Sequence, residues 1–283
     1  AFNARDHRRT DPHLDLTALV RYTQHAMVGF EAGYARKTRS ANLYERYVWS
    51  TNPMAALMNN FAGDGNGYVG DIDLKPEVAH TLSASIDLHD ADRSAWGVKA
   101  TGYVTRVHDY IDAQRCDFGQ CSRANLTATD AFVFLQYAND SALLYGVDLS
   151  GHWLLGRTDR FGSFTAVGSL NYVQGENRTT GDDLYHIMPI NGKLALVHAL
   201  GGWTNTIEFQ AVDDKTRVSS VRNEVPTARY SLLNLRTSYE FEHVRIDLSV
   251  ENVFDRFYSL PLGGAYLGQG ASMSSKTIPW GIS

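Results

Sequence analysis

The chain has 283 residues, of which 43% are hydrophobic and 20% charged, a composition that excludes an intrinsically disordered protein. The net charge is −5 and no block of Lys and Arg occurs, so we expect no nucleic-acid partner. Aromatic residues reach 11% and there are 24 glycines, a combination typical of long β-strands. No run of about eighteen apolar residues is present, so the sequence predicts no membrane-spanning helix.

Alternation of apolar and polar residues predicts eleven β-strands along the chain. The last strand is typical, because Ile246 and Leu248 fall on one face while Arg245 and Asp247 fall on the other. Each strand approaches the roughly ten residues that a tilted membrane strand needs. In chain order the strands cover 14–23, 26–36, 81–88, 95–109, 131–139, 145–153, 161–174, 190–199, 202–213, 233–241 and 244–251.

The connections between the predicted strands alternate between short and long. Short links lie near 24–25, 139–140, 201–202 and 242–243, and long connections cover 37–77, 112–130, 175–189 and 214–228. Aromatic residues such as Trp96, Trp153 and Trp203 gather at strand ends, and charges occur in mid-strand. Short turns at one end, long loops at the other, aromatic girdles and a polar inner face are typical of an outer-membrane β-barrel. A soluble β-sandwich also alternates and is the alternative.

The two cysteines, Cys116 and Cys121, are separated by four residues within a polar segment. An even number of cysteines in an exported protein predicts a disulfide, here one that closes a small loop. A thiolate site for Cu(I) or Zn is the alternative. Two sulfurs without a nearby His fall short of the four ligands of a structural zinc site, so the residues favour the disulfide.

Two methionines, Met54 and Met58, are spaced so that one helical turn would bring both side chains to the same face. Thioethers are soft ligands that suit Cu(I), which makes the pair a candidate metal site. The alternative, which the two residues alone favour, is adaptable packing over the mouth of a barrel. Met188 and Met273 are weaker candidates of the same kind.

No catalytic motif is present, so we expect no catalytic residues, no cofactor and no enzyme activity. The sequence lacks H-E-x-x-H, G-x-S-x-G and G-x-x-x-x-G-K-[ST], and the ten histidines are scattered. The glycine-rich segment 61–73 contains several oxygen ligands but does not match an EF-hand loop. We predict a flexible loop there.

Three segments resemble signatures of the TonB-dependent outer-membrane receptors. EAGYARKTRSANLYERY at 31–47 is similar to a barrel motif of the family, LKPE at 74–77 precedes an alternating strand, and VENVFDRFY at 250–258 resembles a run near the end of the barrel. They stand in the family's order. The resemblance implies a transmembrane antiparallel β-barrel of about 22 strands with an amino-terminal plug. Residues 1–283 would be its carboxy-terminal half, without the plug and the final strand.

The closest likeness within the family is to the copper-receptor branch, through 49–54, 261–270, 278–282 and the cysteine pair. This resemblance implies active import of a metal, copper first, through a monomeric barrel in the lipid of the bacterial outer membrane. TonB would be contacted by the missing amino-terminal part, and key copper ligands would lie on the missing plug. A receptor for a ferric siderophore or another chelate is the alternative, and a passive porin is a second.

Overall fold

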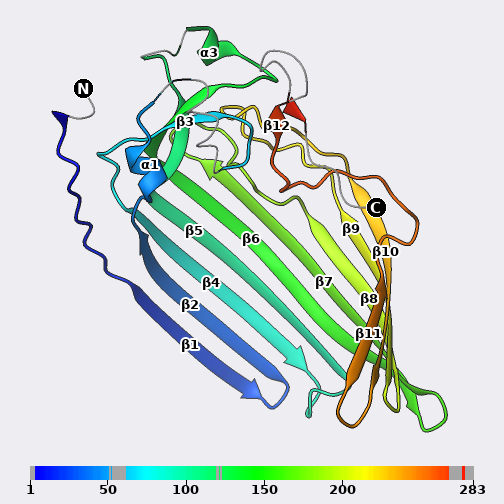
Figure 1. Ribbon diagram of the computed structural model, residues 1–283. Coiled ribbons are helices and arrows are strands. Elements are labelled where there is room, and N and C mark those ends of the chain that lie inside the picture. Colours follow the sequence, from blue (N-terminus) through cyan, green and yellow to red (C-terminus); the bar gives the residue numbers. More distant parts are fainter. Residues whose placement is uncertain are drawn as a thin grey trace.

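The computed structural model describes residues 4–50, 52, 62–118, 121, 123–267 and 276–277. It is an all-β structure built around one curved sheet of 11 strands, of which ten form a continuous antiparallel path (Figure 1). The strands of its continuous path are β1 (Leu16–His25), β2 (Val28–Arg39), β4 (Glu77–His89), β5 (Trp96–Arg115), β6 (Phe134–Thr158), β7 (Gly162–Asn177), β8 (Asn191–Leu200), β9 (Trp203–Val212), β10 (Tyr230–Glu240) and β11 (Arg245–Val250). The predicted fold class is confirmed.

The remaining elements are short and gather at one end of the sheet (Figure 1). They are α1 (Leu43–Tyr47), β3 (Gly67–Val69), α3 (Arg123–Thr127), β12 (Tyr266–Leu267) and β13 (Lys276–Thr277). β3 pairs in parallel with the start of β6, and β12 pairs with β13. None of the helices in the described part of the chain is long and apolar enough to cross a membrane.

The connections alternate in length as the sequence predicts. Short turns at 26–27, 90–95, 159–161, 201–202 and 241–244 lie at one end of the sheet, and long loops at 40–76, 116–133, 178–190 and 213–229 lie at the other. We call these the turn end and the loop end. At the turn end Trp96 stacks on Trp153 with ring centroids 6.1 Å apart, and Trp203 meets Tyr239 at 4.8 Å. These pairs form an aromatic girdle of the expected kind.

The predicted link at 139–140 is wrong, because β6 runs unbroken through it for 25 residues. Asn and Asp are common turn residues, but here long-range partners hold both side chains within a strand. The Asn139 amide donates to the carbonyls of Lys75 at 3.0 Å and Asp109 at 2.7 Å. Asp140 accepts hydrogen bonds from Gln114 and Asn177, each at 2.9 Å. The predicted strands 131–139 and 145–153 are therefore one strand.

Strand register separates an apolar face from a polar one across the whole sheet. Leu82 lies directly opposite Tyr34 on β2 and Val104 on β5, and towards the other edge of the sheet Leu235 on β10 lies opposite Val250 on β11. The apolar side chains are uncovered by protein: Val147 is 50% exposed and Leu248 is 67% exposed. An apolar face of this extent on a single sheet suits contact with lipid.

The buried core lies at the loop end and not in the middle of the sheet. Tyr68, Val133 and Leu135 have no exposed surface and pack in one cluster with Ile111 and Tyr137. A second cluster joins Leu184 of the 178–190 loop to Val107 and Ala142 on the sheet. The buried core that can position a site therefore consists of loops packed against the ends of β5 and β6.

Candidate functional site: the loop assembly

The long loops contact one another and form a single body, which we call the loop assembly and define as the described residues of 40–76, 116–133, 178–190 and 213–229. The Tyr185 hydroxyl donates to the Ala62 carbonyl at 3.3 Å, which joins two of the loops. The later segment 261–265 reaches the same body, because the Ala265 amide donates to the Gly63 carbonyl at 2.7 Å. Gly264 has a positive φ of 73°, and a Cβ there would collide with the Gly63 carbonyl.

Arg222 is the centre of the loop assembly. Its guanidinium donates to Asp112 at 2.7 Å and to the Tyr68 hydroxyl, and lies 3.5 Å from Asp64. It also lies over the Tyr185 ring, 5.2 Å from the centroid. These partners come from two loops, 40–76 and 178–190, and from β5, so this buried side chain of the 213–229 loop joins four segments of the chain. A buried cation with hydrogen-bonded anionic partners fixes its surroundings, because loss of any partner leaves a charge without compensation.

The protonation of this cluster follows from its burial. Burial raises the pKa of Tyr68 well above its ordinary value, so the phenol stays protonated and donates a hydrogen bond to Asp64. Burial alone would lower the pKa of Arg222, but Tyr68, Asp112 and Asp64 raise it well above its ordinary value. The guanidinium therefore stays charged, and we call this buried ionic cluster the Arg222 lock.

Arg115, at the end of β5, makes a second lock between two loops. Its guanidinium donates to the carbonyls of Val221 at 2.9 Å, Ser220 at 2.9 Å and Ala128 at 2.6 Å, and to the Asn223 side chain at 2.7 Å. Several carbonyls of the 116–133 and 213–229 loops thus accept hydrogen bonds from the Arg115 side chain. Backbone groups in irregular loops need such partners when they are withdrawn from water.

A third ionic contact lies between Lys215 and Glu224, whose side chains are 2% and 6% exposed. The Lys215 ammonium also donates to the Pro261 carbonyl at 3.0 Å, and Glu224 accepts from the His186 amide at 3.2 Å. The His186 ring stacks on Tyr185 with centroids 3.8 Å apart. Partial burial lowers the pKa of His186, and the Lys215 ammonium lowers it further, so the neutral imidazole is favoured.

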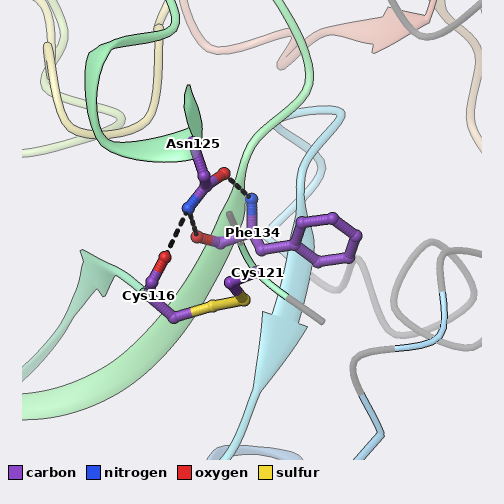
Figure 2. Close-up of a disulfide and its surroundings, with 4 residues drawn as sticks. All are labelled: Cys116, Cys121, Asn125 and Phe134. Carbon is purple, nitrogen blue, oxygen red and sulfur yellow. Dashed lines mark hydrogen bonds between the residues drawn. A yellow bond between two sulfur atoms is a disulfide. The ribbon is translucent and has the colours of Figure 1, made fainter. Parts of the chain in front are cut away.

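The cysteine pair lies where β5 enters the loop assembly (Figure 2). Cys116 and Cys121 are joined as a disulfide, with Cα atoms 6.1 Å apart. Beside it, the Asn125 amide donates to the carbonyls of Cys116 at 2.8 Å and Phe134 at 2.9 Å, and its oxygen accepts from the Phe134 amide at 2.7 Å. One side chain of α3 thus connects the end of β5 to the start of β6.

The methionine candidates are not brought together by the described structure. Met54, Met58 and Met273 lie outside the described residues. Met188 lines a hollow of about 240 Å³ between β7 and the 178–190 and 213–229 loops, where Lys215 and an ion pair of Asp183 with Arg217 at 3.2 Å also lie. Within the described ranges, no group of three or more His, Cys, Asp or Glu side chains could hold a metal ion.

The sequence did not predict the buried contacts of Arg222, Arg115 and Lys215. The prediction of a flexible loop at 61–73 was wrong. Asp64 and Asn66 are buried, which contradicts the predicted flexible loop: the Asn66 amide donates to Asp64 at 2.9 Å and to the Arg222 carbonyl at 2.7 Å. Arg222 and its partner Asp112 are 110 positions apart. A single basic residue in a polar loop carries no local signal of such a partner, so the loop assembly could not be predicted.

The polar face of the sheet carries a line of alternating charges. Glu208 lies 3.9 Å from Lys193 and 3.3 Å from Arg236, and Arg236 lies 3.4 Å from Glu251. Lys193, Glu208 and Arg236 lie on the adjacent strands β8, β9 and β10, and Glu251 directly follows β11. Charges of this density in mid-strand require water or a polar partner, which agrees with the prediction of a polar lumen.

Comparisons with known proteins agree with this architecture. The family described as "TonB dependent receptor-like, beta-barrel" matches residues 3–253, so the chain belongs to the TonB-dependent receptor family. It is 26% identical to the Heme/hemopexin utilization protein C of Haemophilus influenzae (strain 86-028NP), over 88% of this chain and 35% of that protein. The chain thus spans about a third of the curated relatives that it matches.

Solved structures share the fold. The copper transporter OprC superimposes with a TM-score of 0.71 at 19% identity, over 93% of this chain and 37% of that chain. The FrpB iron transporter from Neisseria meningitidis gives 0.59 at 15% identity, over 87% and 35%. The chain is part of an outer-membrane barrel, as predicted, and in such barrels short turns face the periplasm and long loops face the outside. The loop assembly is therefore on the outer side.

Proposed function

We propose that this chain forms wall and outer mouth of a receptor that actively imports a metal or a metal chelate. The observation that carries the proposal is the loop assembly, in which Arg222, Arg115 and Lys215 fix the outer loops against one another. Loops fixed before the substrate arrives lose little conformational entropy when it binds. A receptor for a scarce substrate needs the high affinity that such fixed loops allow, whereas a passive pore needs no high affinity. TonB would supply the drive through a part of the protein outside this chain.

Copper is the first substrate that we propose. The support is the likeness of 261–270 and 278–282 to the copper-receptor branch, together with soft thioether residues in the loops, Met54, Met58 and Met188. The first two would be secondary ligands at the mouth. A likeness of fold to a copper transporter is compatible with this choice but does not select it.

Haem or another iron chelate is the second candidate. It is favoured by the curated relatives, which are named for utilisation of haem and hemopexin and match 88% of the chain. An iron-carrying chelate would be held by its organic part as well as by metal ligands. It would therefore depend less on the methionines than a bare copper ion would.

The test is binding by the full-length receptor in detergent, with Cu(I), haem and a ferric siderophore offered in turn. Stoichiometric copper that decreases when Met54→Leu and Met58→Leu are combined supports the copper proposal and gives this chain a ligand role. Met27→Leu is the matched control, because Met27 lies in the 26–27 turn at the opposite end of the sheet. Copper binding that both variants retain places the ligands elsewhere in the protein. Binding of haem alone removes the copper assignment.

The disulfide between Cys116 and Cys121 is proposed as a structural clasp for the 116–133 loop. Its position beside Asn125, which connects β5 to β6, supports this role. Because the two sulfurs are bonded to each other, they would not act as thiolate ligands for the imported metal.

A further inference from the structure

A row of basic side chains lies on the apolar face of the sheet towards its loop end, between Leu16 of β1 and Leu143 of β6 in the same register row. Arg36 on β2, His80 on β4 and Arg106 on β5 are direct cross-strand partners. His108 lies two positions further along β5, its ring edge-on to that of His80 with centroids 5.8 Å apart. We call these four residues the basic row. The residues of the same face one step nearer the turn end are Tyr34, Leu82 and Val104.

The side chains of the basic row have few partners of their own. Arg36 uses one guanidinium nitrogen for the Leu14 carbonyl and the Thr38 hydroxyl. The Tyr34 hydroxyl holds Nδ1 of His80 at 2.8 Å, which fixes that ring in place. Arg106 and His108 are exposed, and no acidic side chain in the described part of the chain bonds with either of them.

Like charges on neighbouring strands repel one another, and an anion between them removes that cost. The fixed charges of this row are those of Arg36 and Arg106, on either side of His80. The nearest acidic residue in the same register row is Glu176, two strands beyond Arg106 and already bonded to Arg178 at 2.9 Å. No described carboxylate therefore lies beside the guanidinium of Arg106, so an anion that binds this row comes from outside the sheet, on the side that faces the membrane.

We propose that the basic row binds phosphate groups of outer-leaflet lipid, the phosphorylated lipid A headgroup of lipopolysaccharide. On β2 and β5 the row follows the lipid-facing residues Tyr34 and Val104 towards the loop end, where we place the depth of the headgroups. Basic side chains at that depth attract anionic lipid, and a guanidinium matches a phosphate with two parallel hydrogen bonds. This site is on the outside of the barrel and is independent of the imported substrate.

The test titrates the full-length receptor in detergent with diphosphorylated lipid A and with the same lipid lacking phosphates, using native mass spectrometry. Arg106→Gln should weaken binding of the phosphorylated lipid about fivefold, and Arg106→Lys should retain most of it. Arg157→Gln is the matched control, because Arg157 is an exposed arginine near the turn end of β6. Its binding should equal that of the unchanged protein.

Three results would overturn the assignment. Equal affinity for the two lipids would show that phosphate is not recognised. An equal loss in Arg106→Gln and Arg157→Gln would show that only net charge matters. Displacement of the lipid by inorganic phosphate at equal concentration would assign the row to a free anion and not to a lipid headgroup.

Discussion

Replacing Arg222 with methionine removes the cation that joins the outer loops and leaves Asp64 and Asp112 buried beside an apolar side chain. Breaking a buried ion pair from one side costs about 3–5 kcal/mol, because the remaining charge loses its compensation. We expect the lower end of this cost, because both carboxylates keep another partner. Asp112 keeps a hydrogen bond from Asn177 at 2.9 Å, and Asp64 keeps one from Asn66 at 2.9 Å. A loss of about 3 kcal/mol raises the population of the opened loops on the order of a hundredfold.

Amide hydrogen exchange of the full-length receptor in detergent measures this opening directly. Exchange in 64–69 and 213–229 should accelerate on that scale in Arg222→Met, while exchange in the strands β8 to β11 stays unchanged. Arg245→Met is the matched control, because its pair with Asp247 is exposed and solvent screens it, so the loops should not respond.

A second variant separates the ionic argument from simple loss of packing. Adding Asp64→Asn and Asp112→Asn to Arg222→Met removes the stranded charges and should restore part of the protection. If Arg222→Met and Arg245→Met exchange at similar rates, the loops are held by something other than the Arg222 lock. If the triple variant is less protected than Arg222→Met alone, the stranded carboxylates are not the cause.

Three further predictions follow from the same contacts. Alkylation of the unreduced receptor should label neither Cys116 nor Cys121, and replacing both with alanine should cost the 116–133 loop about 2 kcal/mol of exchange protection; labelled thiols would contradict the disulfide. The lowered pKa of His186 means that its contribution to stability is present above pH 6.5 and is lost as the pH falls from 6.5 towards the folded value. Protease cleavage of the 178–190 loop should therefore increase on acidification, and less so in His186→Gln; an identical pH profile in that variant would exclude this histidine. The 283-residue chain alone should aggregate or exchange strands in detergent, because β1 and β11 each pair on one side within the described sheet; a monomer that unfolds cooperatively would refute this.

The strands and their faces could be predicted from the sequence because a strand's alternation is a local property. Ile246 and Leu248 point to one face and Arg245 and Asp247 to the other, whatever the rest of the chain does. The link predicted at 139–140 failed for the opposite reason. Its residues are turn-formers, and their partners in the strand, including Lys75, lie far away in the sequence.

The loop assembly was beyond sequence reasoning for the same physical cause. Each lock is a contact between a basic side chain and groups many positions away, as with Arg115 and Val221, 106 positions apart. The basic row on the outer face is partly predictable from the sequence. Alternation places Arg36 and His80 on a definite face of their strands, but only the register shows that they are neighbours.

The most direct test of the central claim is uptake by cells that produce the full-length receptor, measured with copper and with haem, with and without a proton gradient. An active receptor predicts uptake that saturates at low substrate concentration, stops when the gradient is collapsed and falls in Arg222→Met but not in Arg245→Met. Uptake that rises in proportion to concentration and continues without the gradient would identify a passive pore and contradict the account.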